Sequence, residues 1–322
     1  MGLKVILTLL LPMKESIILY IKEKAVFFTL KRFFWLIIIL TGVLILFGLF
    51  QLASNHTLEH IHIRFDYRFW LFALAGFLAQ LIDGALGMAY GVSCSSMLIA
   101  FNVPPVISSA SVHISEVFTT GVSGLSHLRF KNVHRQLLMK LLIPGILGAA
   151  VGAFLLSKYF NGDWIKPFVS TYLMVLGLLI LRKAFFQNNR PGKEIKHVRR
   201  LAFLGGFLDA IGGGGWGPVV VSNLIHQGAN PKRTIGSANT AEFFIALVSS
   251  AVFISVIKIT NWQPVLGILL GGIIAAPLAA YFVKIIRPKP LMIVVGCLIT
   301  LISLYNIYKS IPAFEGLIAL VF

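Results

Sequence analysis

Four acidic residues lie in segments apolar enough to sit in a lipid bilayer: Asp83, Glu116, Asp209 and Glu242. Carboxylates inside a membrane are costly, and they commonly mark proton relays or ion pathways. A carboxylate beside an anion site can couple anion movement to protons, because it is protonated while the anion is bound and ionised when the anion leaves. We therefore predict that all four are coupling residues. Two alternatives are open for the glutamates: they cap backbone N–H groups of interrupted helices, or they pair with basic residues.

Glycine runs interrupt the segments that carry the two aspartates. Gly212 to Gly215 cannot form a stable helix, because each glycine costs about 1 kcal/mol relative to alanine. A helix that restarts near Trp216 would point its positive N-terminal end at the glycine loop, which predicts an anion site. The alternative is that the glycines only allow helices to cross closely. The predicted substrate-binding residues are Gly212, Gly213, Gly214, Gly215, Trp216, Asn223, Asn239, Ser93, Ser95 and His113.

Uncharged donors accompany the glycine loops. Ser93 and Ser95 follow the first loop, although serines in buried helices also bond to their own backbone. His113 and Asn239 each lie about one turn before a glutamate, on the same helical face. His113 could donate to an anion or share a proton with Glu116, or it could simply be a hydrogen-bonded buried histidine.

Enzyme motifs are absent from the sequence, which contains no HExxH, GxSxG, GxxxxGKS/T or CxxC pattern. We therefore predict that the protein is not an enzyme and has no catalytic residues, no metal and no cofactor. The two cysteines, Cys94 and Cys297, indicate no disulfide framework.

The chain contains an internal duplication. Residues 105–116 (PVISSASVHISE) match residues 231–242 (PKRTIGSANTAE) at an offset of 126, and the same offset pairs Gly145 with Gly271. Both glycines begin small-residue stretches that are expected to pack closely between the two copies. In a membrane protein, such a duplication is typical of transporters.

The composition indicates an integral membrane protein. Of 322 residues, 57% are hydrophobic and 12% are charged, and several apolar stretches have the length of about 20 residues that spans a bilayer. The predicted spans cover residues 34–53, 107–127, 137–156, 168–185, 235–257, 265–283 and 291–308. Two further apolar segments, at 70–101 and 201–226, are interrupted by glycine.

Basic residues give the protein a net charge of +17, but they gather in short loops, which favours a membrane topology over nucleic-acid binding. If both glycine-interrupted segments enter and leave on one side, 22 of the 28 lysines and arginines lie in the cytoplasm. If both segments cross fully, the two sides hold 13 and 15. The first topology is favoured. Each repeat then crosses the membrane an odd number of times, so the repeats are inverted.

These observations predict an all-α integral membrane protein with two inverted repeats and one extra N-terminal transmembrane helix. Each repeat has a glycine-interrupted, broken or re-entrant segment and three transmembrane helices. The extra helix is expected to serve in packing or in a homodimer. The predicted parts are a basic interfacial segment (1–33), the extra helix (34–53), repeat 1 (70–186), a basic cytoplasmic linker (187–200), repeat 2 (201–309) and a short C-terminal tail (310–322).

The two glycine-rich segments are GFLAQLIDGALGMAYG and GFLDAIGGGGWGPVVVSNLIHQGANPKRTIGSANTAE. With three spans after each, they resemble the TauE/SafE family of sulfite exporters over about residues 70–309. The second copy matches closely, whereas the first carries Asp83 and Met88 where family members more often have glycine and proline. The resemblance implies movement of sulfite, sulfonates, thiosulfate or related sulfur-containing or organic anions across the bacterial cytoplasmic membrane. The distribution of lysine and arginine predicts a cytoplasmic N-terminus.

We therefore predict a secondary anion transporter that uses protons, with a small anion, protons and the lipid bilayer as its partners. One alternative is a passive anion channel of the same fold, which would tolerate loss of Glu116 and Glu242. Another is a membrane protein that relays sulfur through Cys94.

Overall fold

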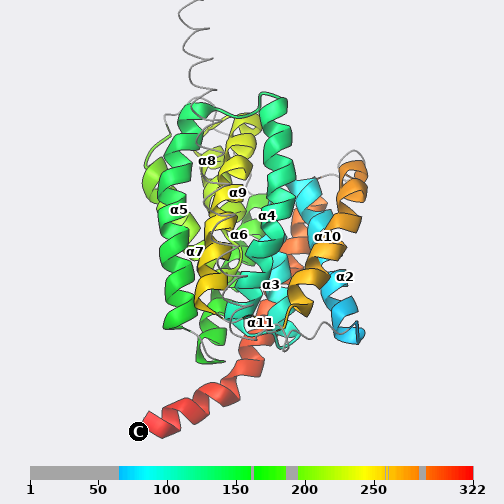
Figure 1. The fold of residues 1–322 in the computed structure, drawn as a ribbon, viewed down its shortest axis with the longest axis vertical. Coiled ribbons are helices and arrows are strands. Elements are labelled where there is room, and N and C mark those ends of the chain that lie inside the picture. The colour runs from blue at the N-terminus through cyan, green and yellow to red at the C-terminus, as the bar shows by residue number, and fades with distance from the viewer. Residues whose placement is uncertain are drawn as a thin grey trace, which may run out of the picture. The chain divides into compact units, whose positions relative to one another are not determined.

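The computed structural model describes residues 65–160, 163–185, 195–257, 259, 261–282 and 288–321. The predicted interfacial segment, the extra helix and residues 187–194 of the linker lie outside the described residues. All regular structure in the described part is helical, which confirms the predicted all-α class (Figure 1). The helices are α2 (Tyr67–Leu86), α3 (Tyr90–Ala100), α4 (Pro105–Arg129), α5 (Arg135–Lys158), α6 (Lys166–Phe185), α7 (Val198–Gly212), α8 (Ser222–His226), α9 (Pro231–Val256), α10 (Gln263–Phe282) and α11 (Pro288–Val321). A short 3₁₀ helix, η2 (Asp163–Ile165), precedes α6, and a π-helix, η3 (Trp216–Val221), precedes α8.

Four of the described helices are long and apolar enough to cross a membrane: α5, α6, α9 and α11. They coincide with the predicted spans at 137–156, 168–185, 235–257 and 291–308. Helices also occupy the predicted spans at 107–127 and 265–283. Of these, α4 has 25 residues but a more polar sequence, with many serines and threonines. The serines of its first half are buried in the protein and are therefore kept from lipid.

Both glycine-interrupted segments fold as helical hairpins. In the first, Gly87 caps the end of α2, and its φ of 65° lies in the left-handed region that glycine adopts easily. After this turn, α3 runs back along the hairpin. The rings of Phe72 and Phe101 are 6.2 Å apart, so the start of α2 lies beside the end of α3. In the second, the backbone N–H of Lys196, just before α7, donates to Oε1 of Gln227, just after α8, at 2.8 Å. The two ends of each hairpin therefore lie close together.

The two copies of the duplication exchange their hairpins. The first hairpin packs through α2 along α10 of the second copy, and the second packs through α7 along α5 of the first copy (Figure 1). The matching helices α4 and α9 pack together, as do α6 and α11. Close contacts occur at the predicted small residues, since a Cβ on Gly206 would meet the backbone of Gly145, and a Cβ on Gly271 would meet that of Ala73. This packing confirms the prediction that the small-residue stretches join the two copies.

Candidate functional site

The tips of the two hairpins touch through their backbones. A Cβ on Gly91 would lie 2.7 Å from the carbonyl oxygen of Gly213 and 2.8 Å from the Cα of Gly214, so only glycine fits there. The glycine run is also held by hydrogen bonds to its carbonyl groups. Ser95 Oγ donates to the Gly213 oxygen at 2.7 Å, and the Tyr172 hydroxyl donates to the Gly214 oxygen at 3.1 Å. The non-helical backbone inside the protein is therefore satisfied partly by neighbouring helices.

An aspartate caps the second helix of each hairpin. Asp83 Oδ1 accepts from the N–H of Tyr90 at 3.3 Å, and Asp209 Oδ1 accepts from the N–H of Trp216 at 2.9 Å. Both pairs are related by the offset of 126, so the two copies use the same device. A carboxylate at a helix N-terminus is stabilised by the positive end of the helix dipole. The capping role considered above for the glutamates is thus filled by aspartates.

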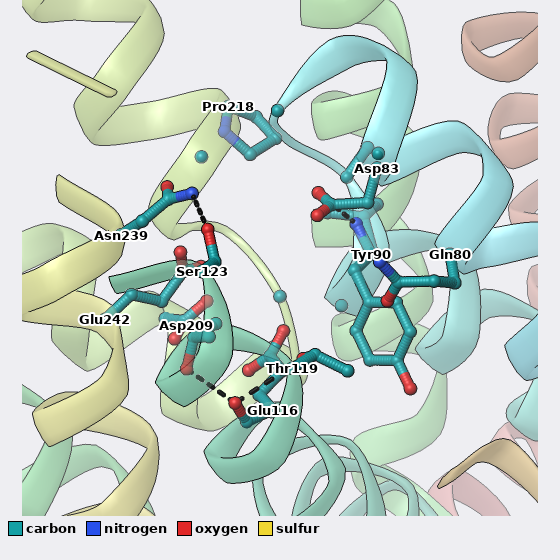
Figure 2. Close-up of a pocket in the computed structure, with 18 of the residues that line it drawn as sticks. Gln80, Asp83, Tyr90, Glu116, Thr119, Ser123, Asp209, Pro218, Asn239 and Glu242 are labelled. Atoms are coloured by element: carbon teal, nitrogen blue, oxygen red, sulfur yellow. Dashed lines mark hydrogen bonds between the residues drawn. The ribbon is translucent and has the colours of Figure 1, made fainter. Parts of the chain in front are cut away.

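A cavity of about 270 Å³ lies between the hairpin tips, α4 and α9. Figure 2 shows its polar side chains, which come from both copies of the duplication. The cavity brings together the four predicted coupling carboxylates, although positions 83 and 242 are 159 residues apart in the sequence. The predicted site residues that line it are Asp83, Glu116, Asp209, Gly214, Gly215, Asn239 and Glu242.

One face of α4 lines the cavity with residues that the sequence analysis did not select. Thr119, Thr120, Ser123 and His127 follow Glu116 at spacings that keep them on one side of a helix. The hydroxyl groups of both threonines donate to the backbone carbonyl of Glu116. This spacing was visible in the sequence, and extending the helical face from Glu116 would have identified them. Gln80 and Tyr90 of the first hairpin also line the cavity.

The two glutamates face the cavity from matching helices, Glu116 from α4 and Glu242 from α9. Glu116 is 3% exposed, and its Oε2 is buried without a hydrogen-bond partner in the described part of the chain. Glu116 is also close enough to Glu242, Asp209 and Asp83 for like charges to repel. A buried carboxylate without a partner is expensive, so this position favours a proton or a ligand.

His113 and Asp209 form a buried pair that joins α4 to α7. His113 Nε2 lies 3.2 Å from Asp209 Oδ2, and the side chains are 0% and 2% exposed. His113 therefore faces the second hairpin and does not line the cavity. Asn239, its counterpart at the offset of 126, does line the cavity and donates through Nδ2 to Ser123 Oγ at 3.0 Å (Figure 2).

The remaining predicted substrate-binding residues lie outside the cavity lining: Gly212, Gly213, Trp216, Ser93, Ser95 and Asn223. Trp216 is fully buried, and its indole N–H donates to the Ala238 carbonyl at 3.1 Å. Asn223 is exposed and accepts from Gln227 Nε2 at 2.9 Å. In this conformation, a small anion in the cavity would meet the backbone of Gly214 and Gly215 before it met these side chains.

Comparisons with known proteins agree with the resemblance seen in the sequence. Residues 72–306 match the family model described as "Sulfite exporter TauE/SafE". The chain is 44% identical over 243 residues to "Probable membrane transporter protein YtnM" of Bacillus subtilis (strain 168). That alignment covers 72% of this chain and 80% of the relative. No solved structure matches the chain significantly.

Proposed function

Because this chain belongs to the TauE/SafE sulfite exporter family, which comprises membrane transporters and not enzymes, we propose that it is a secondary transporter of a sulfur-containing or organic anion. Sulfite and sulfonates are the first candidates. The observation that carries the proposal is the cavity where two glycine-rich hairpin tips meet four carboxylates, of which Glu116 and Asp209 are buried. The transporter would move the anion together with protons across the bacterial cytoplasmic membrane.

Two inverted repeats would provide the transport pathway. Each copy has one hairpin that returns to its starting side, followed by three helices, which gives an odd number of crossings. The exchanged packing of α2 with α10 and of α7 with α5 is the arrangement expected of two such repeats around a pseudo-two-fold axis. The excess of lysine and arginine on one side in this topology supports a cytoplasmic N-terminus.

An anion in the cavity needs donors, and it needs the carboxylates to be neutral. Donors are supplied where α3 and η3 begin, because the first N–H groups of a helix have no partner within it. Gly91, Val92 and Gly217 place this backbone at the cavity. Ionised Glu116 and Glu242 would repel the anion, so protons must bind with it. That requirement is the proposed basis of coupling.

Lys183 of α6 supplies a nearby positive charge. Its Nζ donates to Ser222 Oγ at 3.2 Å and contacts Met88 Sδ at 3.4 Å. Met88 lies in the turn of the first hairpin, between Gly87 and Ala89, which line the cavity. No ion pair joins Lys183 to a carboxylate within the described residues. Its charge is therefore available to attract an anion toward the hairpin tips.

Replacing Lys183 by glutamine should raise the KM for the anion by about three- to tenfold, which corresponds to the loss of roughly 1 kcal/mol of attraction. Initial rates of anion uptake over a range of concentrations would measure this. Lys309, related to Lys183 by the offset of 126, is exposed and serves as the control, since Lys309→Gln should leave KM unchanged. Equal effects of the two substitutions would remove Lys183 from the proposal.

Sulfite flux into proteoliposomes, with and without an imposed pH gradient, tests the proposed function. The native chain should accumulate sulfite when the gradient is imposed. Glu242→Gln should lose this gradient-driven accumulation, because glutamine cannot release a proton. Sulfonate and thiosulfate should be tested in the same way. Absence of flux for every sulfur anion would contradict the substrate class.

A channel of the same fold would behave differently. Flux through a channel would run down the anion gradient, ignore the pH gradient and survive both Glu116→Gln and Glu242→Gln. A sulfur relay through Cys94 is not supported by its position, because Cys94 is fully buried in a cluster with Phe72, Leu98 and Val112, away from the cavity lining.

A further inference from the structure

The contact between His113 and Asp209 requires a proton. His113 Nδ1 lies 2.8 Å from the carbonyl oxygen of Ser109, and a carbonyl only accepts, so Nδ1 carries a hydrogen. In a neutral imidazole, Nε2 then presents a lone pair. That lone pair would face Asp209 Oδ2 at 3.2 Å, where a carboxylate also presents lone pairs, and the contact would be repulsive. A proton between the two atoms converts the repulsion into a charge-assisted hydrogen bond.

The surroundings hold this pair in place. Asp209 is fixed through its other oxygen, which accepts from the Trp216 N–H. The Phe253 ring of α9 packs on the imidazole with 5.9 Å between ring centroids, and both members of the pair are buried. Little water can therefore hydrate either group in this conformation.

The other titratable groups around the pair are mostly acidic. Glu116 is on the same helix as His113. An imidazole nitrogen of His113 and one carboxylate oxygen from each of Glu116 and Asp209 all lie within 4.8 Å of one another. From the elements packed around α4, α10 contributes no acidic, basic or histidine residue. The remaining groups are Glu242 of α9, Asp83 of α2, Tyr90 and Cys94 of α3, and Tyr172 of α6. None of these named neighbours carries a fixed positive charge.

The equivalent pair in the other half is open. The offset of 126 relates His113 to Asn239 and Asp209 to Asp83. Asn239 and Asp83 lie on opposite sides of the cavity, and the amide of Asn239 bonds Ser123 instead (Figure 2). The same two positions are thus in contact in one half and separated in the other. Only the pair in contact contains a histidine. The asparagine of the other pair can donate a hydrogen bond but does not titrate.

We propose that His113 and Asp209 form a proton-binding site that holds the second hairpin against α4, and that loss of this proton releases α7 from α4. In the opposite conformation, Asn239 would approach Asp83 and close the other half. This inference rests on the proposed transport function and adds a third place for a proton, distinct from the two glutamates in the cavity. Because only the His113–Asp209 pair contains a histidine, proton binding to that pair would make the conformational change depend on pH.

A reporter cysteine in the cavity tests the proposal. Ile235 lines the cavity with an apolar side chain, so Ile235→Cys in a Cys297→Ser background leaves the polar groups intact. The Cys297→Ser protein without the reporter retains only Cys94, which is fully buried, and its labelling rate gives the background. Maleimide labelling of the full chain in nanodiscs is measured from pH 5 to 9. A small free thiol in the same buffer corrects for thiol ionisation. The corrected rate should change with pH by up to about tenfold per unit, the limit for one proton.

His113→Asn is the decisive variant, because the second repeat carries asparagine at this position. An asparagine amide does not titrate, so the corrected labelling rate should become independent of pH. Asp209→Asn is a second variant, since its amide oxygen can still accept from Trp216. Asn239→His should add a second pH-dependent step. A single symmetric peak in size-exclusion chromatography identifies folded samples of each variant.

Unchanged pH dependence in His113→Asn or Asp209→Asn would overturn the proposal. A labelling rate that responds to zinc or to a chelator, and not to pH, would also overturn it, because a metal ion and not a proton would then join His113 to Asp209. Failure of the proposed transport function can be distinguished from failure of the proposed proton site. If no sulfur anion is transported but His113→Asn still abolishes the pH dependence of labelling, the proton site stands and the substrate class is wrong.

Discussion

Gly214→Ala should reduce anion transport by about 100-fold, equivalent to roughly 3 kcal/mol. A Cβ at this position would collide with the backbone of Gly91 and Val92, at the tip of the other hairpin. Backbone atoms cannot rotate away as a side chain can, so the two tips would have to separate. Both tips line the cavity, and their separation would displace the donors at the starts of α3 and η3. Anion flux into proteoliposomes and thermal unfolding of the purified chain measure the two effects.

Gly272→Ala provides a matched control for this prediction. A Cβ on Gly272 of α10 would find its nearest neighbour, the Tyr90 hydroxyl, at 3.5 Å, which is ordinary contact. Flux and melting temperature should therefore stay near the native values, or rise slightly because alanine favours a helix. If Gly214→Ala behaved like this control, the hairpin tips could not touch as they do in the structure.

Much of the helical framework could be predicted from the sequence. Apolar stretches about 20 residues long identify membrane helices almost without regard to tertiary context, and α5, α6, α9 and α11 follow them. The hairpins could also be anticipated, because the glycine runs break the helix and the lysine and arginine distribution favours a return to the same side. The cavity's carboxylates were recognisable because acids are rare in apolar segments.

The contacts of individual polar side chains could not be predicted. His113 and Asn239 occupy the same place in the duplicated pattern, yet one bonds an aspartate of the other copy and the other bonds a serine. Internal similarity predicts equivalent positions, but it does not predict which contacts equivalent residues make in one conformation. The hydrogen bonds of Trp216 and Ser95 also could not be predicted, since their partners, Ala238 and Gly213, are distant in the sequence.

The aspartates show how position in the sequence and position in the fold combine. Asp83 and Asp209 were selected as intramembrane acids, and both cap a helix of their own hairpin. The glycine that caps each helix lies four positions after the aspartate, so the loop returns the new N-terminus to the carboxylate. That local geometry repeats in both copies. The additional bond of Asp209 to His113 depends on packing between copies and distinguishes the two positions.

Asp209→Ala should lower the free energy of unfolding by about 3–5 kcal/mol, the range for removing one partner of a buried ion pair. The substitution takes away the acceptor of the Trp216 N–H and the partner of His113 together, and it leaves both groups buried. Chemical unfolding of the purified chain in detergent micelles, followed by tryptophan fluorescence, would measure the loss.

Asp83→Ala is the comparison that isolates the buried pair. Asp83 has the same capping position, but its bond to the Tyr90 N–H is longer, at 3.3 Å, and its side chain borders the cavity. Loss of a helix cap alone costs about 1 kcal/mol, so Asp83→Ala should be less damaging than Asp209→Ala by at least about 2 kcal/mol. Equal losses would mean that His113 contributes nothing to the stability of this conformation. A larger loss for Asp209→Ala, restored in part by Asp209→Asn, would assign the difference to the contact that joins the two copies.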